Sequence, residues 1–172
     1  MSAHTPTRHL LIVWHSRTGA SEQLARAALE GARSVLRELS ACEQVELHIK
    51  TAAEATDIDL LAADAYVFCA PENLGSLSGA MKEFFDRNYY AALERLNGRP
   101  YGLLVAAGSD GTGAVRQVER ICTGWRLRAV APSRIVNTDA QSAEAILAKK
   151  ELAEHQLDVA REMGGTLAAL LA

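Results

Sequence analysis

The sequence predicts an α/β fold: a doubly wound, five-stranded parallel sheet of order 2-1-3-4-5 with helices on both faces. Short apolar runs of roughly five to seven residues alternate with longer segments of helical period, as in strands joined by crossover helices. Three runs are continuously apolar and two have a polar side, which favours three covered strands between two edge strands. The length of 172 residues suits one domain, spanning residues 1–172.

The amino-terminal part predicts two strands and the helix that joins them. Residues 10–14, Leu-Leu-Ile-Val-Trp, are continuously apolar and are expected to form a central strand. Between Leu24 and Leu39, apolar residues recur at helical spacing, which predicts the first crossover helix. Residues 45–50 alternate between apolar and polar side chains, so this second strand is expected at an edge of the sheet.

The middle of the chain predicts the other two central strands. Residues 65–70 and 101–107 are continuous apolar runs, as expected where helices cover both faces of a sheet. Apolar residues between them recur at mostly helical spacing and predict a helix over residues 78–96. The turn sequence Asn-Gly-Arg-Pro at residues 97–100 ends that helix.

The carboxyl-terminal part predicts the remaining elements. Residues 114–122 carry apolar side chains at helical spacing, and residues 127–130 form a short extended segment that suits the second edge strand. From residue 139 onward the pattern is helical to the end, despite the glycines at 164 and 165.

Composition and charge exclude several classes of protein. With 49% hydrophobic and 23% charged residues, the chain is neither disordered nor of low complexity. The formal net charge is only -3, from 18 basic and 21 acidic residues, so nucleic acid is not an expected partner. The first apolar run is too short to span a membrane, so no membrane partner is expected.

Cysteines and histidines indicate neither disulfides nor a metal. Cys42, Cys69 and Cys122 are an odd, scattered set without a Cys-x-x-Cys pair, which favours reduced thiols and a cytoplasmic location. No histidine forms a close pair with a nearby cysteine or carboxylate in the sequence, so a metal site is not expected, although clustering in three dimensions is invisible at this level. The histidines are His4, His9, His15, His48 and His155.

Three loops are expected to meet at one end of the sheet, where the carboxyl ends of its strands lie. In the order 2-1-3-4-5, the segments that leave strands one, three and four gather at the carboxyl ends of the strands, where open α/β folds bind ligands. The first, residues 15–21, has the sequence His-Ser-Arg-Thr-Gly-Ala-Ser and leads into a helix. Its unpaired amides, the helix dipole, its hydroxyls and Arg17 favour a phosphate monoester. The alternative is an ordinary strand-to-helix turn with Ser21 as the helix cap.

Other phosphate chemistries need residues that this chain lacks. A P-loop requires a lysine that is absent from the first loop, which disfavours a kinase or NTPase. A cysteine phosphatase needs a thiolate in the anion loop, and Cys69 has no suitable arginine after it. A phospho-receiver domain needs acidic residues where strands one and three end, but this chain has Trp14-His15 and Ala70-Pro71 there.

The second loop begins at Pro71 and consists of polar and small residues up to Ser78. Its main-chain amides and carbonyls are able to pair with the edge of a flat heterocycle such as an isoalloxazine, without any special side chain. The alternative is a plain turn in which Ser78 caps the next helix.

The third loop, residues 108–113, places three glycines between a central strand and a helix. Such a loop permits close contact with a planar group, although flexibility alone also explains it. It is not a dinucleotide fingerprint, because Arg116 stands where a small residue is needed and no acidic residue follows about twenty positions later. Asp110 is expected to be a turn former rather than a functional carboxylate.

Together, the three loops resemble those of the flavodoxin-like superfamily, and more closely its branch of NAD(P)H-dependent FMN reductases and quinone reductases. The resemblance covers nearly the whole chain. The residues that carry it are Ser16-x-Thr18-Gly19, Pro71-Glu72-Asn73, Ser78-Gly79-Ala80-Met81-Lys82, Phe85-Asp86-Arg87, Gly98-Arg99-Pro100 and the glycine-rich third loop. The chain departs from each subgroup in detail, since its first loop is of flavodoxin style and its second is closer to the reductases.

The resemblance implies FMN as cofactor, with its phosphate in the first loop and its ring between the second and third. Carried over by position, the cofactor contacts are Ser16, Arg17, Thr18, Gly19, Ala20 and Ser21, then Pro71, Glu72, Asn73, Leu74, Gly75 and Ser76, then Gly108, Ser109, Asp110, Gly111, Thr112 and Gly113. The flavin carries the chemistry, so no side chain is assigned a catalytic role.

The expected activity is an FMN-dependent oxidoreductase that passes electrons from NAD(P)H to a quinone, a flavin or a similar small acceptor. The mild net charge favours this enzyme over the main alternative, a flavodoxin-type electron carrier without NAD(P)H activity of its own. A third possibility is a binding or scaffold protein that has lost the cofactor.

Several properties stay open at the level of sequence. The branch is commonly dimeric or tetrameric, so a homodimer or homotetramer is expected, and Tyr89-Tyr90 either covers a neighbouring subunit's flavin or packs within its own chain. Arg116, Arg120, Arg126 and Arg128 either receive the extra phosphate of a nucleotide or lie on solvated surfaces. The preferred nucleotide, the acceptor and the physiological role do not follow from these residues.

Overall fold

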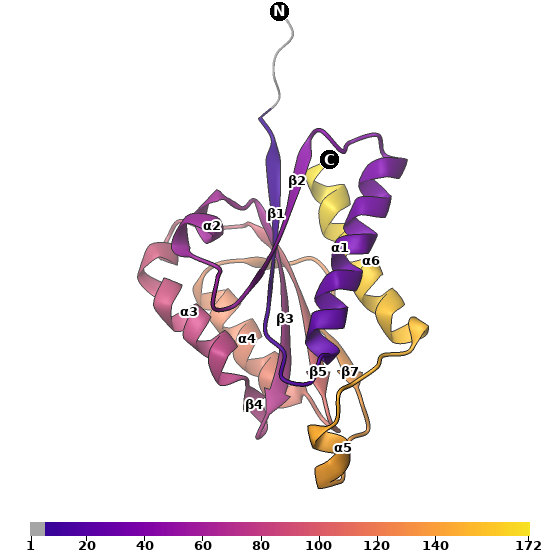
Figure 1. The fold of residues 1–172 in the computed structure, drawn as a ribbon. Coiled ribbons are helices and arrows are strands. Elements are labelled where there is room, and N and C mark those ends of the chain that lie inside the picture. The colour runs from indigo at the N-terminus through magenta and orange to yellow at the C-terminus, as the bar shows by residue number, and fades with distance from the viewer. Residues whose placement is uncertain (1–5) are drawn as a thin grey trace, which may run out of the picture.

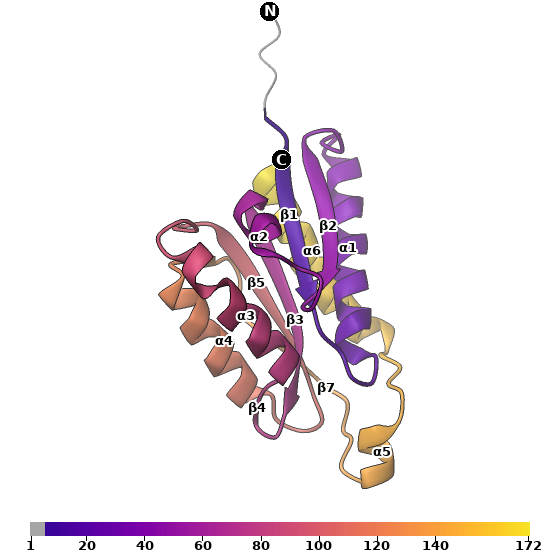
Figure 2. The ribbon, with the colours of Figure 1, turned by 60° about the vertical axis from the view of Figure 1, so that its left-hand side comes forward.

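A parallel sheet forms the middle layer of the protein, with helices on both faces (Figures 1 and 2). The computed structural model describes residues 6–172, so His4 lies outside the described residues. Along the sheet the order is β2-β1-β3-β5, and β5 then pairs with both β6 and β7. The strands are β1 (Arg8–Trp14), β2 (Val45–Thr51), β3 (Ala65–Asn73), β4 (Ser76–Leu77), β5 (Pro100–Ala107), β6 (Arg128–Ala129) and β7 (Arg134–Asn137). The predicted order 2-1-3-4-5 is therefore confirmed, with β5 as its fourth member.

The helices divide between the two faces (Figure 1). One face packs under α1 and α6, and the other under α2, α3 and α4, so that two apolar cores lie on either side of the sheet. The helices are α1 (Ala20–Glu38), α2 (Asp57–Ala62), α3 (Gly79–Ala92), α4 (Thr112–Gly124), α5 (Ala143–Leu147) and α6 (Glu154–Leu171). Because both faces of β1, β3 and β5 are covered, these strands are apolar on successive residues, as expected.

Glycines allow α1 and α6 to approach closely. A Cβ atom on Gly164 would lie 1.9 Å from the carbonyl oxygen of Ala28, and one on Gly31 would lie 2.0 Å from that of Arg161. The Gly164-Gly165 pair is therefore part of the helix contact, and α6 continues through it because packing offsets the low helix propensity of glycine.

The predicted residue ranges of two elements near the carboxyl terminus were wrong. The fifth strand is β7 at residues 134–137, whereas the predicted segment 127–130 contributes only the two-residue β6. The predicted helix from residue 139 onward is interrupted: Ser142 caps the short α5, and α6 begins only at Glu154. The intervening segment instead bonds to the first loop.

Smaller differences concern the middle of the chain. The third strand continues to Asn73 and turns back into β4, which pairs antiparallel with it. Helix α3 ends at Ala92, four residues before the predicted limit of 96. Helix α2, which the apolar pattern did not predict, begins with a capping box formed by Thr56 and Asp59.

All three cysteines are free, as expected. Burial raises the pKa of the Cys69 and Cys122 thiols, so neither is a ready thiolate nucleophile. Within residues 6–172, the helices are too short or too polar to cross a membrane.

Candidate functional site

The loops that follow β1, β3 and β5 lie at the same edge of the sheet, at the carboxyl ends of the strands (Figure 2). We call this edge the loop rim and define it by residues 15–21, 71–78 and 108–113. Parallel pairing of β1 with β3 and of β3 with β5 brings the three segments together. The rim predicted from the sequence therefore exists.

The first loop enters α1 through Gly19, which is the N-cap residue in the left-handed conformation with φ of 96°. Only glycine adopts this conformation at little cost. The hydroxyl of Ser16 accepts a hydrogen bond from the Gly19 amide at 3.0 Å, which stabilises the turn. Ser21 is thus not the helix cap, and the capping role that the alternative gave it is wrong.

Ser21 lies in the first turn of α1 and is completely buried. Within the described part of the chain, its Oγ has no hydrogen-bond partner. Buried hydroxyls nearly always have a partner, because leaving one unpaired costs about 1–3 kcal/mol. The position of Ser21, beside helix amides that have no intrahelical acceptor, suits a bound anion as the missing partner.

A fourth segment supports the first loop from the carboxyl-terminal side. The amide of Lys150 donates to the carbonyl of Thr18 at 2.7 Å, and the amide of Leu152 donates to the side-chain oxygen of Gln23 at 3.0 Å. The Gln23 amide group donates in turn to the carbonyls of Gly19 and Lys150. Sequence reasoning missed this segment because it assigned residues from 139 onward to a helix.

The second loop is a hairpin rather than a plain turn. Leu74 and Gly75 at its tip both have positive φ, 54° and 72°, as in the tight turns that join twisted antiparallel strands. The base of the hairpin is fixed by Gln117 of α4, whose side-chain oxygen accepts from the Ser76 hydroxyl at 2.8 Å and from the Leu77 amide at 2.9 Å. The hairpin is thereby attached to the helix that follows the third loop.

Glu72 joins the second loop to the third. Its carboxylate accepts hydrogen bonds from the amides of Gly111 at 2.9 Å and Ala114 at 3.2 Å, at the amino terminus of α4. A negative charge there interacts favourably with the helix dipole. A Cβ atom on Gly113 would lie 2.0 Å from the carbonyl oxygen of Gly75, so the hairpin rests directly on α4.

Asp110 is a turn former, as predicted. Its carboxylate accepts from the amide and the hydroxyl of Thr112 within the third loop. These bonds close the turn before α4.

His15 joins the first loop to the second. Its Nδ1 lies 2.9 Å from the hydroxyl of Ser78, which is completely buried. Ser78 occupies the N-cap position of α3, but its side chain makes no capping bond, so the predicted capping role is wrong. Partial burial, with a smaller contribution from the charge of Arg17, lowers the pKa of His15 and favours its neutral imidazole.

The rim residues differ in whether their side chains already bond to other groups of the protein. The side chains of Ser16, Glu72, Ser76 and Asp110 are engaged in the bonds described above. Arg17 is exposed at the mouth of the first loop. The predicted cofactor contacts therefore lie in loops that meet at one end of the sheet, and several of their side chains already bond within the protein.

A sequence model of the NADPH-dependent FMN reductases matches residues 14–143, which is well over half of the chain and includes all three loops of the rim. The chain belongs to the NADPH-dependent FMN reductase family. Its fold is flavodoxin-like: a flavodoxin, WrbA-like protein from Agrobacterium tumefaciens superposes with a TM-score of 0.74 at 17% identity, over 96% of this chain and 98% of that chain.

Two curated relatives are similar over part of their length. A protein named flavodoxin from Aquifex aeolicus is 38% identical over 77 residues, which cover 45% of this chain and 38% of the relative. A protein named NAD(P)H dehydrogenase (quinone) from Acidithiobacillus ferrooxidans is 36% identical over 91 residues, or 45% of this chain and 46% of the relative. The matches therefore span less than half the length of these relatives.

FMN is the cofactor that membership of the FMN reductase family indicates. The first loop fits its phosphate, because the buried Ser21 hydroxyl has no hydrogen-bond partner within residues 6–172 and the helix amides beside it attract an anion. Glu72 joins the second loop to the third, Gln117 of α4 holds the base of the hairpin, and His15 joins the first loop to Ser78.

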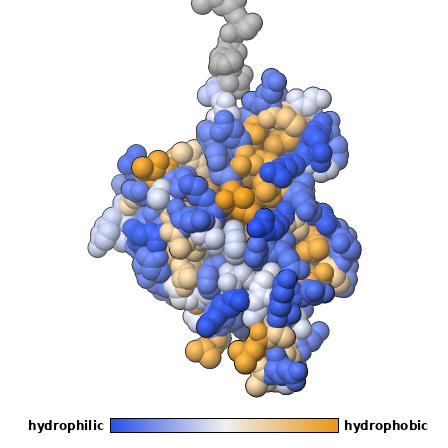
Figure 3. Space-filling model, viewed as in Figure 1, coloured by the Kyte–Doolittle hydropathy of each residue, from blue (hydrophilic) through white to orange (hydrophobic). Residues whose placement is uncertain are grey.

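Exposed apolar side chains border the rim of this reductase-family protein. Leu74 is fully exposed at the tip of the hairpin, and Ile146 and Leu147 are exposed on α5, which lies at the same end of the molecule. Figure 3 shows apolar surface at this end, over the hairpin and α5. By contrast, Tyr89 and Tyr90 are exposed on α3 and stack edge to face with each other.

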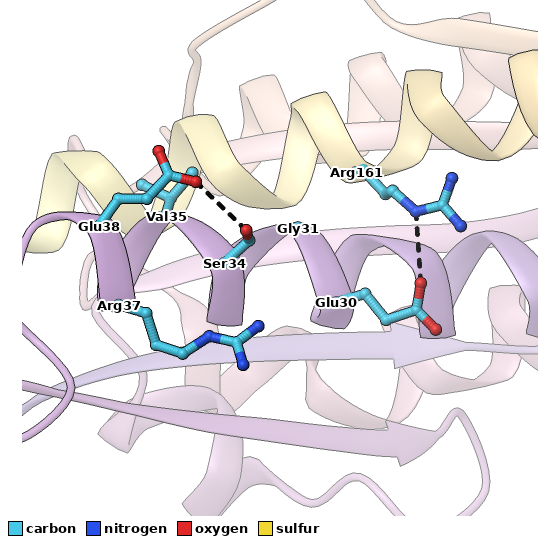
Figure 4. A pocket seen from close by; sticks show the side chains of 7 residues that line it. All are labelled: Glu30, Gly31, Ser34, Val35, Arg37, Glu38 and Arg161. Atoms are coloured by element: carbon cyan, nitrogen blue, oxygen red, sulfur yellow. Dashed lines mark hydrogen bonds and ion pairs between the residues drawn. The ribbon is translucent and has the colours of Figure 1, made fainter.

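A surface hollow of about 400 Å³ lies away from the rim, between α1 and α6 (Figure 4). Arg161 reaches across it to Glu30 at 3.3 Å, and Ser34 donates to Glu38 at 3.3 Å. The hollow is lined by Gly31, where the two helices are in close contact, and by these exposed polar groups. It is therefore a surface groove between two helices.

Proposed function

We propose that this protein is an FMN-dependent oxidoreductase that passes electrons from NAD(P)H to a quinone, a flavin or a similar small acceptor. The observation that carries the proposal is the buried hydroxyl of Ser21 at the amino terminus of α1, which has no hydrogen-bond partner among the described residues and follows the left-handed turn at Gly19. Membership of the FMN reductase family and the similarity to a quinone dehydrogenase support the redox activity.

The residues of the first loop bind and orient the cofactor. Ser21 and the amides of the first turn of α1 hold the phosphate, and Arg17 adds a charge-assisted bond from the solvent side. Bound FMN supplies hydride transfer, which amino-acid side chains cannot perform. The protein contributes position and electrostatics, so no acid or base residue is needed.

The hairpin and the third loop limit the position of the ring. Glu72 and Gln117 hold these loops against α4, and the His15 bond to Ser78 ties them to the phosphate loop. Such rigid attachment keeps the reactive face in one orientation without a large ordering cost on binding. Main-chain groups of residues 71–76 and 108–113 then pair with the ring edge.

The exposed apolar border favours a flat, weakly polar acceptor. Leu74, Ile146 and Leu147 offer apolar contact next to the rim, which suits a quinone or a second flavin better than a charged metabolite. The expectations of a homodimer or homotetramer, of a cytoplasmic location and of a single domain over residues 1–172 stay predictions.

Titration of the full chain with FMN tests the binding step. We expect the flavin fluorescence to be quenched at about one equivalent, and we expect riboflavin, which lacks the phosphate, to bind at least about tenfold more weakly. Equal affinity for the two flavins would contradict the role of the first loop. Failure to bind FMN at all would instead support a protein that has lost its cofactor.

The loaded protein then distinguishes the enzyme from an electron carrier. We expect steady oxidation of NADH or NADPH when a soluble quinone or free flavin is supplied. A loaded protein that oxidises neither nucleotide, but accepts electrons from a protein reductase, would support the carrier alternative, which the similarity to a flavodoxin also favours.

A further inference from the structure

His9, near the start of β1, meets Glu46 and His48 of the neighbouring strand β2, which lie far from it in the sequence. His9 lies opposite Glu46 in the register of the two strands, and His48 lies two residues farther along β2. Because alternate residues of a strand share a face, the three side chains project from the same side of the sheet. Their nitrogen and oxygen atoms meet within 4.8 Å of one another.

The distances among these atoms form a nearly equilateral triangle. His9 Nδ1 lies 3.1 Å from His48 Nε2 and 3.5 Å from Glu46 Oε2, and His48 Nε2 lies 3.6 Å from the same oxygen. Ligand bonds of about 2.0–2.2 Å in tetrahedral geometry imply a separation of about 3.4 Å between ligand atoms. The triangle therefore has the dimensions of one face of a tetrahedral zinc site.

We propose that His9, Glu46 and His48 bind a divalent transition-metal ion, with Zn²⁺ as the best match. Two imidazoles and one carboxylate are a ligand set that zinc accepts, with water in the fourth position. The three side chains are partly exposed, at 30%, 59% and 42%, so an ion reaches them directly from solvent. Mg²⁺ and Ca²⁺ prefer all-oxygen ligands and suit this set poorly.

The surroundings of the cluster also suit a cation. The basic side chains on either side are each paired with a carboxylate: Arg8 with Asp64 at 3.0 Å, and Lys50 with Asp59 at 2.7 Å. The second oxygen of Asp64 accepts from the amide of His9 at 2.9 Å, which fixes the backbone of one ligand. The net charge near the triangle is therefore set mainly by Glu46.

The site is separate from the loop rim. His9 stands near the beginning of β1 and the first loop follows its end, so the two sites are roughly 20 Å apart along the strand. β2 is an edge strand (Figure 2), and an ion shared by His9, Glu46 and His48 would join it to β1. We therefore assign the ion a structural role, independent of the proposed redox activity.

Competition between the full chain and a coloured zinc chelator tests the site. We expect one equivalent of Zn²⁺ to bind to the wild type, and we expect His9→Ala and His48→Ala each to weaken binding by at least about tenfold. Co²⁺ in place of zinc should give the intense visible absorption of a tetrahedral site. Mg²⁺ should not compete.

His155→Ala is the matched control, because His155 is exposed on α6 and far from β2 in the chain. We expect it to bind zinc as the wild type does. Glu46→Gln and His48→Gln keep the size and polarity of side chains on the edge strand, so they test the site even if an alanine variant folds poorly. We expect zinc to raise the melting temperature of the wild type but not of His48→Gln.

Wild-type binding no tighter than that of a His9→Ala/His48→Ala double variant would overturn the proposal, as would an equal zinc effect on the melting temperature of both proteins. FMN binding by His48→Gln should equal that of the wild type. A protein that binds zinc but no flavin would therefore refute the proposed function and leave the metal site standing.

Discussion

Ser21 in the first loop and Glu72 in the second both lie beside the amino terminus of a helix, but the protein treats them differently. Glu72 accepts two backbone hydrogen bonds from α4 and so satisfies that helix end internally. In the described residues, Ser21 is buried at the end of α1 with no partner for its hydroxyl. A group that is already bonded contributes to the structure, whereas a buried group with no partner in residues 6–172 still has a hydrogen bond to offer to a water molecule or a ligand.

This contrast separates the loop rim into two parts. The hairpin and the third loop form a wall whose polar side chains are mostly engaged with one another, through Glu72, Ser76 and Asp110. The first loop instead holds the amides at the start of α1, the exposed Arg17 and the buried Ser21 hydroxyl, which we propose as the groups that bind an anion. Changes in the wall should therefore alter stability first, and changes at Ser21 should alter binding first.

The largest expected effect follows from replacing Gly113 by alanine. The new Cβ would lie 2.0 Å from the Gly75 carbonyl oxygen, so the hairpin must move away from α4, at a cost of about 3 kcal/mol in the free energy of unfolding. Chemical denaturation measures this. Among residues 6–172, a Cβ atom on Gly124 of the same helix would meet no atom within 4 Å, so Gly124→Ala should be neutral or slightly stabilising. Similar effects of the two variants would show that the wall is not tightly packed.

Ser21→Ala should change binding and stability in opposite directions. Loss of a hydrogen bond to a charged phosphate weakens FMN binding by about 2 kcal/mol, or roughly thirtyfold, while riboflavin binding should hardly change. The cofactor-free variant should be as stable as the cofactor-free wild type or slightly more stable, because the substitution removes a buried hydroxyl that has no partner in the described part of the chain. Fluorescence titration and thermal unfolding give the two values.

Ser34→Ala is the control for Ser21→Ala. Ser34 also belongs to α1, but its hydroxyl donates to Glu38 on the exposed side of the helix. We expect Ser34→Ala to bind FMN as tightly as the wild type does. A Ser21→Ala protein that binds FMN as tightly as Ser34→Ala does would remove the main support for the phosphate site.

Glu72→Gln should have an intermediate effect. The amide keeps one acceptor for the α4 amides but loses the negative charge and one of the two bonds, so we expect about 1 kcal/mol less stability. Urea denaturation checks this value. Glu43→Gln, at an exposed position between α1 and β2, should leave stability unchanged. If Glu72→Gln leaves the free energy of unfolding unchanged, the hydrogen bonds between the two loops contribute little to stability.

The smallest effect concerns pH and His15. Its pKa in the folded protein lies below the ordinary value of 6.5, so the unfolded chain binds the proton more readily. Stability should therefore fall as the pH drops below about 6.5, until the folded imidazole is also protonated. His15→Gln should reduce this part of the acid dependence, whereas His155→Gln should not. Equal pH profiles for the wild type and both variants would argue against a buried neutral His15.

Sequence patterns were sufficient for the sheet because each central strand is a continuous apolar run. The runs at β1, β3 and β5 identified the strands, and the number of covered and edge strands restricted their order. The same reasoning brought the three loops to one end. The last strand was placed wrongly because its pattern is short. β7 has only four residues, and the predicted strand at 127–130 has a similar composition.

The details of the site depended on contacts between distant residues. Glu72 and Gln117 are ordinary polar residues in the sequence, and only the fold places them at the ends of one hydrogen-bonded joint. The segment around Lys150 follows α5 and reaches Thr18 through a backbone bond, which has no residue signature. Sequence reasoning could not find such bonds, because a main-chain group is the same at every position.

The sequence by itself determined the central strands, the helices that follow β1, β3 and β5, and the position of the first loop, because apolar periodicity and turn residues act over a few neighbouring positions. Only the tertiary structure decided that the Ser21 hydroxyl has no partner among residues 6–172 and that the ligand atoms of His9, Glu46 and His48 lie as close together as the ligands of one metal ion. Both features arise where strands and helices far apart in the chain are packed together. That packing decides which polar groups have a hydrogen-bond partner, and the amino-acid sequence alone does not show which ones they are.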